Sequence, residues 1–134
     1  AKEKTKALIG EKADFIFHNA NDGAQGVFAA VQEARGQGVF AFGANDDQAS
    51  MAPDVILASA VLDIPKCFVD VVRRVKEGSF DGKTQLLGLA EGYVWVAYNK
   101  QLEDKIPAGV RKQADELVGK IKDRSIKVER MSLK

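Results

Sequence analysis

Short apolar runs alternate along the chain with longer segments of mixed character. Three of these runs are predicted to be strands, at residues 13–17, 39–42 and 54–60. The longer segments carry apolar residues three or four positions apart, which is the spacing of one helix face. This spacing holds over residues 24–34, 64–75 and 108–121. Strands that alternate with helices predict an α/β fold with a largely parallel, layered sheet, covered on both faces.

The clearest helix pattern begins after Asp63, which is expected to cap the helix. Ile64, Cys67, Phe68, Val71, Val72 and Val75 form one apolar stripe, and Pro65 suits the first turn. Because Cys67 lies on this stripe, it is predicted to be buried and unreactive. A further short helix is expected over residues 2–9, and Asp22 can cap the helix that follows the first strand.

A hairpin is predicted in the second half of the chain. Residues 85–89 and 93–97 are predicted strands that flank Ala90-Glu91-Gly92, where glycine can supply the turn. A last short strand is expected at residues 126–128. Together with the preceding elements, these features predict a single α/β domain over residues 1–134.

Two predicted strands each run directly into a group of small polar and acidic residues. The first is followed by His18-Asn19-Ala20-Asn21-Asp22, and the second by Gly43-Ala44-Asn45-Asp46-Asp47-Gln48. In an open parallel sheet, ligands bind beyond the carboxyl ends of the strands. These residues therefore predict a polar rim suited to a small molecule rich in hydroxyl or amide groups. The alternative is that Asn and Asp here only make turns and helix caps.

Composition narrows the choice of function. The chain has 20 basic and 19 acidic residues, so no net field attracts nucleic acid or an anionic membrane. Its single cysteine excludes an intrachain disulfide. No apolar run is long enough to predict a membrane-spanning helix. We therefore expect a small-molecule ligand and no nucleic-acid partner.

Several residues have alternative chemical interpretations. His18 is the only histidine, and it could act as a base, a metal ligand, a ligand-binding group or a packed neutral side chain. Asp46 and Asp47 could hold magnesium, but no phosphate-binding loop accompanies them. Tyr93 and Trp95 could form a stacking wall or part of a core. Ser59 lacks the motif of a hydrolase nucleophile. No catalytic residue, metal site or cofactor is predicted.

Four segments resemble motifs of the basic membrane protein family, which comprises substrate-binding lipoproteins of ABC transporters, including purine-nucleoside receptors. Residues 13–28 resemble "GADVIF…GxGVF", and residues 42–48 resemble "IGVDSDQ". Residues 52–59 resemble "APDVVLTS", and residues 87–92 resemble "LGLKDGGV". The motifs occur in the family's order and spacing over roughly residues 5–128.

The resemblance implies a lobe of a type I periplasmic-binding-protein-like fold. It implies that the chain corresponds to the C-terminal part of a two-lobed receptor, whose N-terminal part supplies the other half of the cleft. A member of this family is expected to bind a purine, a nucleoside or a similar polar metabolite without catalysis. The full-length protein is expected to be a membrane-anchored lipoprotein in the periplasm or another extracytoplasmic location, with an ABC transporter permease as its partner.

The resemblance also assigns residues to the ligand site. The family's glycine-rich loop maps to residues 19–25, and its aspartate motif maps to residues 45–48. The expected ligand-binding residues are Asn19, Asn21, Asp22, Asn45, Asp47, Gln48 and Glu91. Asn45 replaces the family's sugar-binding aspartate, and Leu62 replaces a lysine. These changes favour a base or another polar metabolite over a nucleoside.

Two other functions fit the same sequence. One is a sensor or regulatory domain of this fold inside a longer protein, and the other is a metal-dependent α/β enzyme that uses Asp46 and Asp47. The resemblance further implies that the helix after Ser59 belongs with the other lobe. The isolated chain is therefore expected to self-associate, by exchange of this segment between two copies.

Overall fold

The computed structural model describes residues 1–129, which belong to two compact units. Unit 1 contains residues 1–62 and 96–107. Unit 2 contains residues 63–95 and the described residues from 108 onward. The chain thus leaves unit 1 after its third strand, builds part of unit 2 and then returns.

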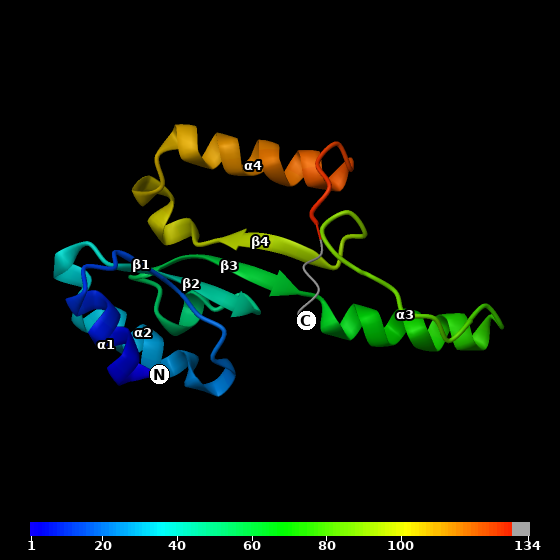
Figure 1. Cartoon of the computed structure of the whole chain (residues 1–134), viewed down its shortest axis with the longest axis horizontal. Coiled ribbons are helices and arrows are strands. Elements are labelled where there is room, and N and C mark those ends of the chain that lie inside the picture. The colour runs from blue at the N-terminus through cyan, green and yellow to red at the C-terminus, as the bar shows by residue number, and fades with distance from the viewer. Residues whose placement is uncertain (130–134) are drawn as a thin grey trace. The chain divides into compact units, whose positions relative to one another are not determined.

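A four-stranded sheet in the order β1-β2-β3-β4 organises unit 1 (Figure 1). Parallel pairing joins β1 (Phe15–Phe17), β2 (Phe40–Asn45) and β3 (Ile56–Leu62). The last strand, β4 (Val94–Tyr98), runs against β3 in the opposite direction, and the N–H of Asn99 donates to Leu57 O at 2.9 Å. The predicted α/β fold with a parallel-dominated sheet is confirmed.

Two helices of unit 1 cover one face of this sheet (Figure 1). They are α1 (Lys2–Gly10) and α2 (Ala24–Glu33), and short 3₁₀ turns η1 (Asn21–Gly23), η2 (Arg35–Gln37), η3 (Ala49–Met51) and η4 (Lys100–Lys105) connect the other elements. Val27, Phe28 and Val31 of α2 are buried against Ile16 and Ile56. Spacing of three and four residues on α2 therefore produces the core, as the sequence predicts.

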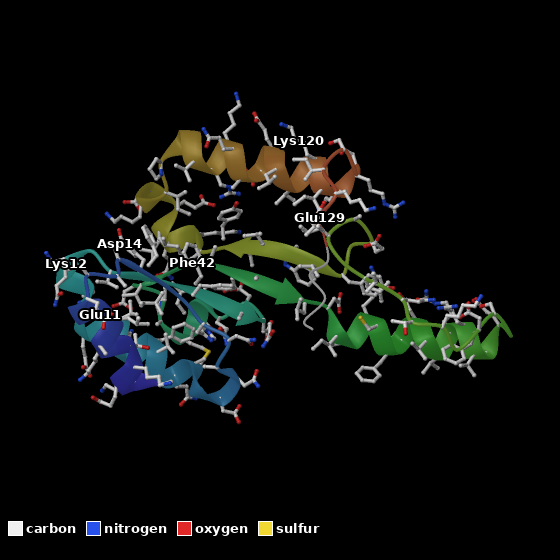
Figure 2. The ribbon with its side chains drawn as sticks, in the orientation of Figure 1. Glu11, Lys12, Asp14, Phe42, Lys120 and Glu129 are labelled. Carbon is white, nitrogen blue, oxygen red and sulfur yellow. The ribbon has the colours of Figure 1, made fainter. Side chains whose placement is uncertain are left out.

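The other face of the sheet carries four phenylalanines, Phe15, Phe17, Phe40 and Phe42. Phe15 stacks on Phe40 with ring centroids 6.4 Å apart, and Phe42 lies on the side of the sheet away from α1 and α2 (Figure 2). Phe15 is 53% exposed and Phe17 is 66% exposed. The helices of unit 1 pack on one face of the sheet alone, so within this unit the second face lacks the predicted cover.

Unit 2 contains α3 (Ile64–Lys76) and α4 (Ala108–Lys122). Asp63 caps α3, as predicted, by accepting the N–H of Lys66 at 2.9 Å. The apolar stripe of α3 is nevertheless exposed, with Phe68 at 70% and Val72 at 67%. No described residue of unit 2 is buried, and Cys67 is half-buried. The prediction of a buried thiol is wrong because helical periodicity shows that a face is apolar without showing what covers it.

The predicted hairpin is only half present. Residues 85–89 form no strand, and Leu86 is 65% exposed. The N–H of Tyr93 instead donates to Gly88 O at 3.0 Å, which closes a turn before β4. Residues 126–128 form no strand either, and the N–H of Ile126 donates to Lys120 O after the end of α4. In each segment one backbone hydrogen bond closes a local turn where a strand is predicted.

The side chain of Tyr93 packs on α3 within unit 2. Its hydroxyl donates to the carboxylate of Asp70, and the Lys66 ammonium lies 4.0 Å from the centroid of its ring. The hydrogen bond from Tyr93 is the largest cause of a lowered pKa at Asp70, and Arg73 adds an opposite charge. The ring of Tyr93 is thus occupied by contacts with α3.

The docking of α1 on α2 is expected to weaken in acid. Lys2 Nζ lies 2.5 Å and Lys6 Nζ 2.8 Å from the carboxylate of Glu33. The hydrogen bond from Lys2, followed by that from Lys6, lowers the pKa of Glu33 from 4.5 to about 2. As the pH falls below 4.5, Glu33 takes up a proton in the unfolded chain before it does so in the folded chain. This contribution to stability is therefore complete above pH 4.5 and is lost as the pH falls toward 2.

Thermal melts of the native chain and of Glu33→Gln between about pH 6 and about pH 3 measure this effect. The variant should lose less stability than the native chain over that range. Glu11→Gln is the matched control, because no described residue bonds to the exposed Glu11 carboxylate. An equal pH dependence in all three proteins would contradict the assignment. Added salt should reduce the difference, since both ion pairs are exposed.

Candidate functional site

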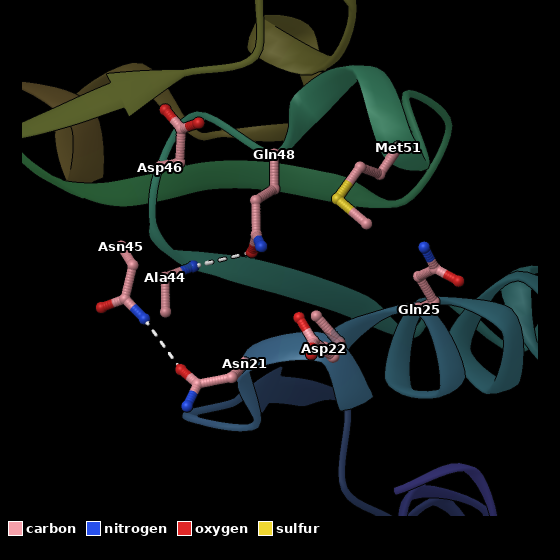
Figure 3. Close-up of a pocket in the computed structure, with 9 residues that line it drawn as sticks. Asn21, Asp22, Gln25, Ala44, Asn45, Asp46, Gln48 and Met51 are labelled. Carbon is pink, nitrogen blue, oxygen red and sulfur yellow. Dashed lines mark hydrogen bonds between the residues drawn. The ribbon is translucent and has the colours of Figure 1, made fainter.

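A hollow of about 380 Å³ opens in unit 1 where β1 and β2 end (Figure 3). Its walls come from η1 and the start of α2 on one side and from the end of β2 and η3 on the other. The lining residues are Asn21, Asp22, Ala24, Gln25, Ala44, Asn45, Asp46, Gln48 and Met51. This is the edge of the sheet at which the sequence predicts a ligand.

The structure brings four of the predicted site residues together in this hollow: Asn21, Asp22, Asn45 and Gln48. Asn19 and Asp47 are exposed and do not line the hollow. Glu91 belongs to unit 2 and is described with that unit. The hollow of unit 1 therefore brings together four of the seven residues predicted to bind the ligand.

Asn21 and Asn45 face each other across the mouth of the hollow (Figure 3). Asn45 Nδ2 donates to Asn21 Oδ1 at 3.4 Å. Both residues have a positive φ, 44° at Asn21 and 72° at Asn45, a conformation that asparagine tolerates better than most residues. Asparagine at these two places thus satisfies the backbone and supplies the polar rim.

Asp22 does not cap α2, contrary to the prediction. Gly23 occupies the N-cap position, and no side chain caps the helix. No described residue bonds to the Asp22 carboxylate, which leaves its oxygens available at the hollow.

Asp46 and Asp47 each use one carboxylate oxygen to accept a backbone N–H in the turn that follows β2. Asp46 Oδ1 accepts the N–H of Asp47 at 2.8 Å, and Asp47 Oδ1 accepts the N–H of Ala49 at 3.1 Å. The turn-forming alternative therefore describes Asp47 well.

His18 and Gln48 form the best-connected pair at the hollow. His18 is buried at the end of β1, and its ring meets the ring of Phe28 edge-on at 5.1 Å. His18 Nε2 lies 2.9 Å from Gln48 Oε1, and that oxygen also accepts the N–H of Ala44 at 3.0 Å. The N–H of Gln48 donates to Ser59 Oγ at 3.1 Å. Gln48 thus connects the ends of β1 and β2 with the middle of β3.

Gly43 makes this arrangement sterically feasible. A side chain at position 43 would collide with Ser59 Oγ and would lie 3.0 Å from Gln48 Cβ. Glycine is therefore required by the close approach of β2 to Ser59, which is 1% exposed. From the sequence, Ser59 is considered only as a nucleophile, and its role as an acceptor is not predicted. A serine in an apolar strand opposite a glycine is the signal that could have indicated it.

The carboxylate of Glu91 makes hydrogen bonds and an ion pair within unit 2. It accepts the N–H of Gly88 at 2.9 Å and pairs with the Arg124 guanidinium at 3.1 Å. The bond from Gly88, followed by that from Arg124, lowers the pKa of Glu91 below its ordinary value.

Gln25 and Met51 line the hollow of unit 1, although neither is predicted as a ligand-binding residue. A residue one helical turn past a strand-end motif is the signal that could have found Met51.

Among residues 1–129, no three His, Cys, Asp or Glu side chains are grouped so that they could hold a metal ion. In the same part of the chain, no helix combines the length and apolar character that crossing a bilayer requires.

Comparison with known families agrees with the motifs in the sequence. The family model Bmp, described as "ABC transporter substrate-binding protein PnrA-like", matches residues 1–131. A purine-binding protein of Brucella abortus is 29% identical over 120 residues, which are 90% of this chain and 32% of that protein. Basic membrane protein A of Borreliella burgdorferi is 29% identical over 89% of this chain and 34% of that protein. The chain spans about a third of the length of these relatives.

Solved structures show the same fold at low sequence identity. An ABC transporter solute-binding protein from Aeropyrum pernix is 22% identical, with a TM-score of 0.81 over 94% of this chain and 43% of that chain. A transcriptional activator of the comK gene from Bacillus halodurans is 23% identical, with a TM-score of 0.79 over 92% of this chain and 42% of that chain. These likenesses show a periplasmic-binding-protein-like fold.

Proposed function

Because the chain belongs to the Bmp family of PnrA-like ABC transporter substrate-binding proteins, we propose that it supplies one side of a transporter receptor's ligand cleft. The ligand is a small polar metabolite, such as a purine base or a nucleoside. The chain binds this molecule without chemical conversion. In the full-length protein, an extracytoplasmic lipoprotein, the loaded receptor delivers its ligand to an ABC transporter permease.

One observation carries this proposal. Four polar residues predicted from two strand-end motifs, Asn21, Asp22, Asn45 and Gln48, line one hollow at the carboxyl edge of the sheet. Amide groups both donate and accept hydrogen bonds, whereas an ionised carboxylate only accepts. This mixture matches the edge of a purine or a group of sugar hydroxyls. The relative from Brucella abortus is named a purine-binding protein, which supports the same class of ligand.

The test is a titration of the ¹⁵N-labelled chain with purine bases, nucleosides and sugars. We expect amide shifts at Asn21 and Asn45 with a dissociation constant of about 1–5 mM, and little heat in calorimetry, because one wall of a cleft gives little stacking and desolvation. Asn45→Ala should weaken the response, and Lys4→Ala on α1 is the control. Micromolar binding that Asn45→Ala leaves unchanged would place the site elsewhere.

The isolated chain is expected to self-associate through the apolar stripe of α3. Phe68, Val72 and Val75 of this stripe are each more than half exposed. A second copy that receives the segment after Ser59 would cover them, and segment exchange is a low-cost route to a dimer. Light scattering should show a dimer whose population falls in the doubly substituted chain Phe68→Lys/Val72→Lys. Val128→Lys, at an equally exposed position outside α3, is the control. A monomer at high concentration contradicts the prediction.

A further inference from the structure

Two backbone N–H groups fix the orientation of both side chains in the His18–Gln48 pair. The N–H of Ala20 donates to His18 Nδ1 at 3.3 Å, so this nitrogen is an acceptor. In the neutral ring the proton is then on Nε2, which donates to Gln48 Oε1 at 2.9 Å. The N–H of Ala44 can meet only an acceptor, and it points at the same oxygen. The amide of Gln48 therefore has one allowed orientation.

The oxygen of Gln48 accepts two hydrogen bonds, which uses both of its lone pairs. Its amide nitrogen bonds to no residue in the described part of the chain. Every buried side-chain nitrogen or oxygen of residues 1–129 has a hydrogen-bond partner, so this nitrogen is not sealed inside the protein. Gln48 itself lines the hollow (Figure 3). Two N–H donors with a fixed direction are therefore available to a molecule bound there.

We propose that Gln48, held by His18 and Ala44, determines specificity at this hollow by presenting donors only, so that a ligand must place an acceptor against it. The proposal rests on the proposed binding function and narrows its ligand class. A glutamine that is free to rotate can offer either its oxygen or its nitrogen. This glutamine cannot turn without leaving the Ala44 N–H and the His18 Nε2–H unpaired, at a cost that favours one orientation strongly.

The rest of the rim defines the other side of the ligand. The carboxylates of Asp22 and Asp46 can only accept, so they require N–H or O–H groups. The thioether of Met51, which is 43% exposed, offers an apolar surface on which a flat ring can rest. The ligand class is thus a flat heterocycle that places a carbonyl oxygen toward Gln48 and N–H groups toward the carboxylates. A 6-oxopurine base has this arrangement.

Hypoxanthine and adenine test the proposal because they have nearly the same shape. Hypoxanthine has an acceptor at position 6 and an N–H at position 1, and adenine has the reverse. Gln48→Glu keeps an oxygen for His18 and Ala44 but replaces the donor with an acceptor. Gln101→Glu is the matched control, since it makes the same chemical change at an exposed glutamine of η4 that does not line the hollow. Thermal melts of both variants check that they are folded.

The chain should bind hypoxanthine more tightly than adenine in amide-shift titrations up to about 5 mM. Gln48→Glu should lower the ratio of hypoxanthine affinity to adenine affinity by at least about tenfold, because it leaves an acceptor against an acceptor. Gln101→Glu should change that ratio by less than about twofold. An unchanged ratio in Gln48→Glu overturns the role of Gln48 while leaving ligand binding intact.

The ring nitrogens of His18 give a second measurement that needs no ligand. Their ¹⁵N chemical shifts should show an unprotonated Nδ1 and a protonated Nε2 when the imidazole ring is neutral. A proton on Nδ1 overturns the fixed orientation of Gln48, whatever the titrations show. A chain that binds neither base at about 5 mM contradicts the proposed function, and the specificity role fails with it. The two failures are therefore distinguishable.

Discussion

Replacing Asn99 by alanine is expected to destabilise the chain by about 2–4 kcal/mol, among the largest effects of any single substitution in unit 1. Asn99 is 5% exposed, and its amide nitrogen donates to Pro53 O at 2.9 Å and to Ile56 O at 2.7 Å. Its side-chain oxygen accepts the N–H of Gln101 at 3.0 Å. One side chain thus ties the end of β4 to the start of β3. Alanine would leave buried carbonyl groups without partners.

Urea unfolding measures this loss as a lower midpoint. Asn99→Asp keeps the acceptor for Gln101 but turns an oxygen toward two carbonyls, so at neutral pH it should be at least as damaging as alanine. Its stability relative to alanine should improve as the pH falls, because a protonated carboxyl can donate once. Asn19→Ala is the control, since the exposed side chain of Asn19 bonds to no described residue. Equal midpoints for Asn99→Ala and Asn19→Ala would contradict the assignment.

Gly43→Ala is the second substitution with a large expected effect, about 1–3 kcal/mol of lost stability. The new methyl group would collide with Ser59 Oγ and crowd Gln48 Cβ. Because both neighbours belong to the hydrogen-bonded set around Gln48, the damage should reach the hollow. The amide signals of Ala44 and Gln48 should shift even under conditions where the variant is fully folded. Gly36→Ala is the control, as nothing lies within 4 Å of a methyl group there.

A double substitution separates crowding from backbone effects. Gly43→Ala combined with Ser59→Gly removes the colliding hydroxyl, so its loss of stability should be less than the sum of the two single losses. Strict additivity would mean that Ser59 is not the obstacle. Ser59→Gly alone should also be destabilising, because the N–H of Gln48 loses its acceptor.

The parallel sheet could be predicted from the sequence because the strands and helices of unit 1 are locally patterned. Val27, Phe28 and Val31 repeat with helical spacing, and the apolar runs at Phe15 and Phe40 are too short for helices. The local pattern of residues does not decide whether the segment around Leu86 forms a strand. A short apolar segment forms a strand only when another strand lies beside it, and the local sequence does not identify that neighbour.

The candidate site was predictable in part for a similar reason. Strand ends place Asn21 and Asn45 at one sheet edge in any parallel α/β unit, so their meeting follows from topology. The orientation of Gln48 depends on contacts among residues far apart in sequence, His18 and Ser59. Short sequence motifs do not predict hydrogen bonds between residues so far apart in the sequence. The exposed stripe of α3 shows the same limit, because spacing identifies a face and tertiary structure decides its environment.

The return of the chain to β4 has a consequence for folding and for engineering. Residues 63–93 separate two neighbouring antiparallel strands, and the N–H of Asp63 donates to Tyr93 O at 2.8 Å where this excursion begins and ends. Pairing of β4 must therefore overcome the closure entropy of a long loop, which rises only slowly with loop length. The excursion is in effect an insertion between the two arms of a β-hairpin. A two-residue turn in its place should yield a smaller protein that retains Asn99 and the hollow.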